Sequence, residues 1–124
     1  MLKTMESAEN YLETILILKK RNGSVRSIDI AHELEFSKPS VSVAMKRLRE
    51  KEYITVEDGG LIEFTDKGRK LAESIYERHV LLTKALVSLG VDPETAAEDA
   101  CRIEHYISQE TFDKIKEHFN DHIN

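Results

Sequence analysis

The chain has 124 residues, 40% of them hydrophobic and 33% charged, which suits one compact helix-rich domain or two very small ones and argues against disorder. The net charge is −5, and no apolar run approaches the roughly 20 residues of a membrane-spanning helix. We therefore expect no membrane association. The lack of an apolar leader and the single cysteine, which excludes an internal disulfide, favour a reducing cytoplasmic location.

The charge is unevenly distributed along the chain. Residues 19–70 carry 12 Lys and Arg against 9 Asp and Glu, whereas residues 71–124 carry 5 against 11. Phosphate binding needs a local positive face, so the balance within a segment matters more than the total. This pattern indicates a DNA-facing first part joined to an acidic part of different function.

The first half predicts three helices and a hairpin. Apolar residues recur every three to four positions over residues 6–20, and Asn22-Gly23 is typical of a helix end. We expect Ser27 to cap a second helix and Ser37 a third. The β-formers of residues 53–56 and 61–65 flank a Glu-Asp-Gly-Gly turn, which predicts a β-hairpin.

Three helices followed by a hairpin is the order of a winged helix-turn-helix, in which the third helix enters the major groove of double-stranded DNA. That helix begins with small hydroxyl residues, which can bond phosphates or base edges, and carries several cations. The candidate DNA-binding residues are Arg26, Ser37, Lys38, Pro39, Ser40, Ser42, Lys46 and Arg47.

The second half predicts helices only. A long helix begins at Thr65 or Asp66 and ends at Gly90, and Asp92-Pro93 opens another that reaches about Tyr106. Ser108 caps a last helix. A set of apolar side chains exceeds what so small a unit would bury, which favours dimerisation: Leu81, Leu82, Leu86, Val87, Leu89 and Phe112. The fold class is mainly α, with domains at residues 1–72 and 73–124.

Cys101, Glu104 and His105 place three potential metal ligands at spacings i, i+3 and i+4. In a helix these spacings bring the side chains to one face, about one turn apart. Each residue alone has an ordinary structural alternative: a buried thiol, a solvated carboxylate or a hydrogen-bonded histidine. Together they favour a metal site.

Four segments resemble the diphtheria-toxin-repressor family of metal-dependent transcriptional regulators: residues 8–15, residues 37–42, the Arg78-His79 pair and residues 98–105. The resemblance covers nearly the whole chain. It implies a homodimer, with metal bound between a DNA-binding module and a dimerisation module. Long members carry an additional SH3-like domain that this sequence lacks, so we expect the short form.

The resemblance also implies the ligands: Asn10, Glu13, His79, Cys101, Glu104 and His105. His79 and the Glu104-His105 pair match ligands directly. Glu13 matches a ligand of the manganese-responsive branch, and Cys101 one of the iron-responsive branch. Asn10 departs from both branches, which have Met or Asp there, although its amide oxygen can bind a hard cation.

The implied donor set suits Fe(II) better than Mn(II), because a thiolate is a softer ligand than the oxygen donors that Mn(II) prefers. The sequence thus predicts a metal-dependent repressor of metal-homeostasis genes that uses Fe(II) or Mn(II). A metal-independent winged-helix regulator of a small organic ligand is the alternative. An enzyme is not expected: His32-Glu33 begins like a metallopeptidase motif, but Phe36 stands where a histidine is needed.

Overall fold

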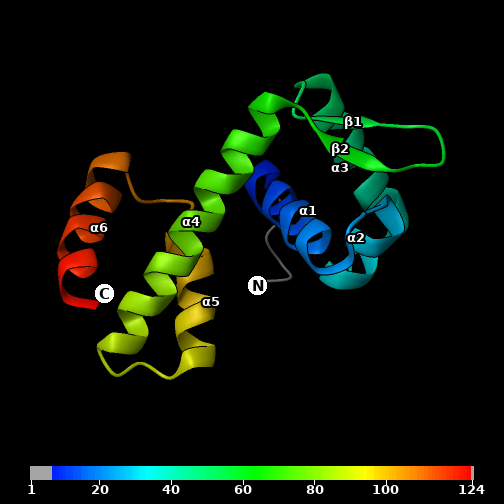
Figure 1. Ribbon diagram of the computed structural model, residues 1–124. Helices are drawn as coiled ribbons and strands as arrows, with labels where there is room; N and C mark the ends of the chain where they lie inside the picture. Colours follow the sequence, from blue (N-terminus) through cyan, green and yellow to red (C-terminus); the bar gives the residue numbers. More distant parts are fainter. Residues whose placement is uncertain (1–6, 124) are drawn as a thin grey trace. The chain divides into compact units, whose positions relative to one another are not determined.

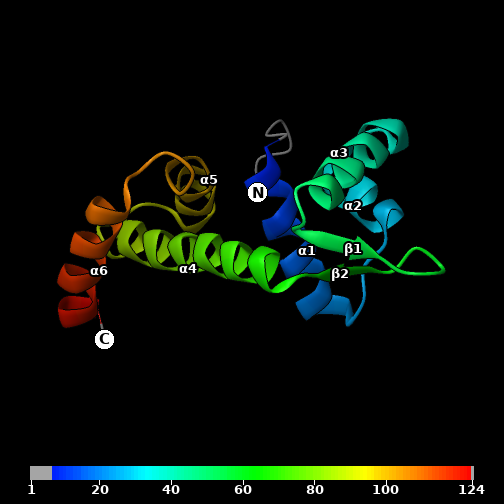
Figure 2. The same cartoon turned by 90° about the horizontal axis from the view of Figure 1, so that it is seen from above.

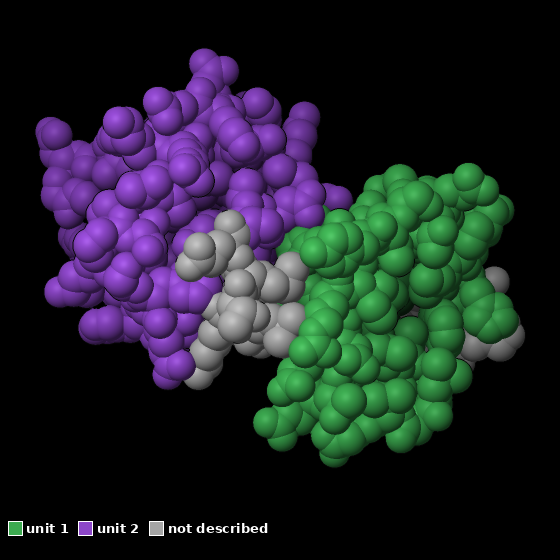
Figure 3. All heavy atoms as spheres, turned by 180° about the vertical axis from the view of Figure 1, so that it is seen from behind, with its two compact units in different colours: residues 1–2, 75–124 green, residues 3–74 purple. Residues whose placement is uncertain are grey.

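The computed structural model describes residues 7–123, and the side chains of residues 7–120. The elements, labelled in Figure 1, are α1 (Ala8–Asn22), α2 (Ser27–Leu34), α3 (Lys38–Glu50), β1 (Ile54–Val56), β2 (Ile62–Phe64), α4 (Asp66–Ser88), α5 (Pro93–Ile103) and α6 (Gln109–Ile123). They form two compact units, coloured in Figure 3: unit 2 holds residues 7–74 and unit 1 holds residues 75–123 of the described part.

Unit 2 is the expected winged helix-turn-helix. Antiparallel pairing sets Ile54 opposite Phe64 and Val56 opposite Ile62, and the loop of this hairpin extends beyond α2 and α3 in both views (Figures 1 and 2). Helices α1, α2 and α3 bury their apolar faces in one core. Its fully buried members include Leu12, Ile15, Ile30, Leu34, Val41, Leu48 and Ile62.

Local sequence explains where these helices begin and end. The Ser7 side chain caps α1 by accepting a hydrogen bond from the Asn10 N–H, and Gly23 ends the helix at φ 85°. Ser37 caps α3, as predicted. The prediction that Ser27 caps α2 is wrong: Arg26 takes the cap position, and its backbone N–H donates to the Asp29 carboxylate at 2.8 Å.

A close backbone approach fixes the start of α4 against the hairpin. A Cβ atom on Gly68 would lie 1.9 Å from the Tyr53 carbonyl oxygen, so this position accepts only glycine. The Thr65 hydroxyl donates to the Glu52 carbonyl at 2.6 Å and accepts the Gly68 N–H at 3.1 Å. Thr65 therefore caps α4 and ties it to the turn before β1.

Unit 1 consists of residues 75–88 of α4 together with α5 and α6. Asp92 caps α5 as expected, but α5 ends at Ile103 and not near Tyr106. Phe112 and Leu82 are buried within the chain, at 1% and 4% exposure, so the expectation that they contribute apolar surface for a dimer is wrong. Among the described residues, no helix has both the length and the apolar character that crossing a membrane requires.

Candidate functional site

Three ligand-type side chains of unit 1 converge at the end of α5. The Cys101 sulfur, a Glu104 oxygen and a His105 ring nitrogen lie within 4.8 Å of one another. Although Glu104 follows the last residue of α5, its N–H still donates to the Ala100 carbonyl at 2.9 Å and its backbone stays helical. The helical spacing that the sequence suggested is therefore kept for Cys101 and Glu104 beyond the end of the helix.

His79 reaches the same point from α4. Its Nδ1 lies 2.9 Å from Glu104 Oε2, and His105 Nε2 lies 3.4 Å from Glu104 Oε1. The Glu104 carboxylate is fully buried, and the two histidine side chains are 22% and 5% exposed. Three predicted ligands of unit 1, His79, Cys101 and His105, thus lie near the fourth, the Glu104 carboxylate.

The spacing and chemistry of these donors fit a divalent transition metal. In an octahedral site with bonds of about 2.1 Å, neighbouring donors lie about 3 Å apart and opposite donors about 4.2 Å apart. The two distances from the histidine nitrogens to the Glu104 oxygens, 2.9 and 3.4 Å, are close to the separation of neighbouring donors. Imidazole, carboxylate and thiolate together form a borderline donor set that suits Fe(II), Co(II) or Zn(II).

Arg78 holds the chain segment that carries these ligands. Its guanidinium donates to the carbonyl oxygens of Glu104 at 3.1 Å and Ile107 at 2.9 Å, and to Gln109 Oε1 at 2.9 Å. It also lies 5.4 Å from the centre of the Phe112 ring. In the sequence, Arg78 stands out only as part of the Arg78-His79 pair that resembles the family. Its hydrogen-bond acceptors lie 26 or more residues away, so the residues next to it do not predict these contacts.

The remaining two predicted ligands lie on α1 in unit 2. Asn10 and Glu13 are three residues apart, so they share one face of the helix. Both have 0% exposure. A carboxylate is rarely buried unless an ion pair, hydrogen bonds or a metal stabilise its charge. The complete burial of Glu13 is therefore unusual for a glutamate.

The predicted DNA-binding residues of α3 lie on its exposed side. Ser37, Lys38, Pro39, Ser40, Ser42, Lys46 and Arg47 are all exposed. The Ser40 N–H donates to Ser37 Oγ at 3.2 Å, and the two hydroxyls lie 2.9 Å apart. These hydroxyls and the cations along the helix give a polar, positively charged face that suits a phosphate backbone.

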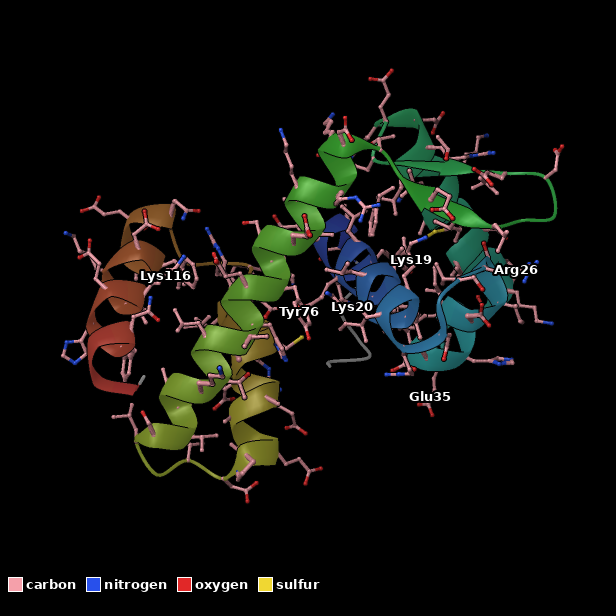
Figure 4. The ribbon with its side chains drawn as sticks, viewed as in Figure 1. Lys19, Lys20, Arg26, Glu35, Tyr76 and Lys116 are labelled. Carbon is pink, nitrogen blue, oxygen red and sulfur yellow. The ribbon has the colours of Figure 1, made fainter. Side chains whose placement is uncertain are left out.

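Arg26, the remaining predicted DNA-binding residue, also has a structural role. Its Nε donates to the Gly59 carbonyl at 2.9 Å, which ties the residue before α2 to the tip of the hairpin. Figure 4 labels Arg26 next to α2. The Arg26 side chain therefore braces the wing, a contact that the sequence did not predict.

Comparison with known proteins follows the same division of the chain. Residues 3–60 match the N-terminal DNA-binding domain of iron-dependent repressors, and residues 65–122 match their metal binding and dimerisation domain. Transcriptional regulator MntR of Salmonella typhimurium is 38% identical over 108 residues, which are 87% of this chain and 69% of that protein. An uncharacterised HTH-type regulator of Methanocaldococcus jannaschii is 34% identical over 90% of both chains.

Solved structures agree in fold. The manganese regulator SloR superposes with a TM-score of 0.83 at 26% identity, over 94% of this chain and 55% of its own. A manganese-dependent transcriptional repressor in complex with manganese gives 0.82 at 26% identity, over 92% and 53%. The chain thus spans about half the length of these solved proteins.

Proposed function

Since the chain belongs to the iron-dependent repressor family of metal-dependent transcriptional regulators, which are not enzymes, we propose that it represses metal-homeostasis genes when Fe(II) or Mn(II) is bound. The observation that carries this proposal is the cluster of Cys101, Glu104 and His105, in which the Glu104 carboxylate lies within hydrogen-bonding distance of His79. Operator DNA is the expected partner. Since such DNA lies in the cytoplasm, we expect the protein to be cytoplasmic.

For the metal site, we propose that His79, Cys101, Glu104 and His105 of unit 1 are joined by Glu13 of α1. Asn10 lies on the same face of α1 and supplies a weaker oxygen donor. A bound divalent ion supplies positive charge, which offsets the negative charges of two carboxylates and a thiolate. The ion would then link α1 to unit 1, because its positive charge attracts the negatively charged ligands of both.

The same charges explain how metal binding would control DNA binding. Without the ion, Glu13, Cys101 and Glu104 repel one another, so a state with α1 close to these ligands is disfavoured. An effector can shift such an equilibrium only by its different affinity for the two states. The state with α1 close to the ligands of unit 1 would have the higher affinity for metal, because only that state lets Glu13 bind the ion. Glu13 is the charged candidate ligand that unit 2 contributes.

For DNA, we propose that the N-terminal part of α3 enters the major groove. Ser37, Pro39 and Ser40 would lie nearest the bases, and Lys46 and Arg47 would bind phosphates. The proposal also places three flanking contacts on this side of unit 2: Arg26, Lys38 and Ser42. Residues 1–72 would thus form the DNA-binding domain and residues 73–124 the metal-binding and dimerisation domain.

The proposed homodimer rests on the family's dimerisation domain and on apolar side chains of unit 1. Leu89 is 71% exposed and Val87 is 40% exposed at the end of α4. Large apolar side chains that stay exposed together often mark a protein interface. Light scattering of the purified chain should give the mass of a dimer.

Metal-dependent binding to the gene's own promoter, measured anaerobically with Fe(II) and with Mn(II), tests the function. We expect His79→Ala and His105→Ala to lose metal activation while keeping the helical content of the wild type. His118→Ala, an exposed histidine of α6, is the matched control and should respond normally. Normal activation in both ligand variants, or no stoichiometric metal binding in calorimetry, would contradict the proposal.

A further inference from the structure

Helix α3 carries a large apolar side chain, Val43, on the face that points away from the core. Val41, Met45 and Leu48 are its buried residues and face the centre of unit 2. Each residue of an α-helix turns the chain by about 100°. Val43 is two residues from both Val41 and Met45, so it lies about 160° around the helix from each of them and points away from the core.

This position leaves Val43 half exposed, at 50%. The other large hydrophobic residues that are exposed in the described part of the chain, Val87, Leu89 and Tyr106, all belong to unit 1. Within the described residues of unit 2, Val43 is thus the one large hydrophobic residue with as much as half of its surface exposed. An apolar residue at the centre of an otherwise polar helix face gains no stability from burial in the folded protein.

The neighbours of Val43 are the residues assigned above to DNA. Pro39 and Ser40 lie one turn before it, and Lys46 and Arg47 one turn after it, all on the same face of α3. A surface hollow of about 320 Å³ opens here, lined by Tyr11, Pro39, Ser40, Val43, Ala44 and Arg47. Its lining is apolar around Val43 and cationic at Arg47, so it suits a small apolar group beside a phosphate.

We propose that Val43 is a specificity-determining residue that contacts the C5-methyl group of a thymine in the operator. This inference rests on the proposed function and adds one base preference to it. The thymine methyl is the one apolar group that the four DNA bases present on their major-groove edges. A valine has no hydrogen-bond donor or acceptor, so it can select among base edges only by this methyl group.

Deoxyuridine tests the contact, because it differs from thymidine only by the missing methyl group. The operator is first selected from random DNA with metal-loaded wild-type protein, and each thymine is then replaced singly by deoxyuridine. We expect one position in each half-site to weaken wild-type binding about fourfold, the value of one buried methyl group. Other thymines of the operator serve as internal controls.

Variants of Val43 complete a double-mutant cycle. Val43→Ser changes both protomers of the proposed dimer and removes two methyl contacts, so it should bind the thymine operator about 15-fold more weakly than the wild type and show no further loss with deoxyuridine. Val43→Ile, which keeps an apolar side chain, should retain sensitivity to the methyl group. Because the side chain is exposed, both variants should melt at the wild-type temperature.

The outcomes separate this inference from the proposed function. If the wild type shows no metal-dependent selection of any sequence, the proposed function fails and this contact fails with it. If the wild type binds its operator but no thymine is sensitive, or if Val43→Ser keeps the full deoxyuridine penalty, only the Val43 contact is overturned.

Discussion

We expect the choice of metal to depend on single residues, above all on Cys101. Its thiol is buried and lies beside the candidate ligands Glu104 and His105. A thiolate favours Fe(II), whereas an oxygen ligand at the same place favours Mn(II). We expect Cys101→Glu to shift activation toward Mn(II), measured as the metal concentration that gives half-maximal DNA binding under anaerobic conditions. Oxidation of the thiol should weaken the response to either metal.

Cys101→Ala provides the complementary measurement, because it removes the sulfur without adding an oxygen donor. It should weaken the response to Fe(II) more than the response to Mn(II). If the wild type responds to Mn(II) alone and Cys101→Ala changes neither response, then Cys101 is a buried structural residue. The preference for iron would then be wrong, although the rest of the ligand set would stand.

A substitution of Arg47 tests the proposed contact of α3 with the DNA backbone. Each phosphate contact contributes about 0.9 to the slope of log affinity against log salt concentration. Arg47→Ala should therefore lower that slope by about one for each protomer bound and weaken binding to all sequences alike. Lys114→Ala, which removes an exposed lysine of α6 in unit 1, is the control and should leave the slope nearly unchanged. A change in sequence preference at constant slope would assign Arg47 to a base.

At the scale of the elements, the positions of the candidate metal ligands depend on how α4, α5 and α6 are joined. Arg78 of α4 binds two backbone carbonyls in the turn after α5 and a side chain at the start of α6. Groups that orient metal ligands typically contribute about 10- to 100-fold to metal affinity. We expect Arg78→Ala to raise the metal dissociation constant by this order, measured by anaerobic calorimetry.

Arg78→Lys separates positioning from charge. A lysine keeps the positive charge but cannot replace the planar fork that reaches several acceptors, so metal binding should still weaken. Arg102→Ala, which removes an exposed arginine of α5 paired with Asp99 at 3.4 Å, is the control. Wild-type metal affinity in both Arg78 variants would show that the turn keeps the ligands in place without this side chain.

Some features of the elements follow from the local sequence and others do not. Helical periodicity, the caps Ser37 and Asp92, and the β-formers of the hairpin are local signals, so the order and type of the elements could be predicted. The cap of α2 could not be predicted because Asp29 accepts the backbone N–H of Arg26, three residues earlier, and any residue but proline supplies that N–H. The outward position of Val43 follows from the same helical period. The contacts of Arg78, in contrast, depend on packing between segments far apart in the sequence, which no local pattern encodes.

At the scale of the whole molecule, regulation requires that metal binding in one unit affects DNA binding by the other. Coupling of this kind is reciprocal: if metal raises operator affinity by some factor, operator must raise metal affinity by the same factor. Typical couplings are about 5- to 150-fold. Titrating metal in calorimetry with and without operator DNA should give a ratio of dissociation constants equal to the activation measured in DNA binding. Unequal factors would contradict a simple two-state switch.

Glu13 is the residue on which this coupling should depend, because it is the charged candidate ligand that unit 2 contributes. Glu13→Gln removes one ligand charge and also one source of repulsion in the metal-free protein. Metal affinity should therefore fall while metal-free DNA binding rises, so that the activation factor approaches one. Glu9→Gln, one turn earlier on α1, is the matched control and should keep wild-type activation. If Glu13→Gln lowers metal affinity but leaves metal-free DNA binding unchanged, Glu13 is a ligand and repulsion plays no part in the switch.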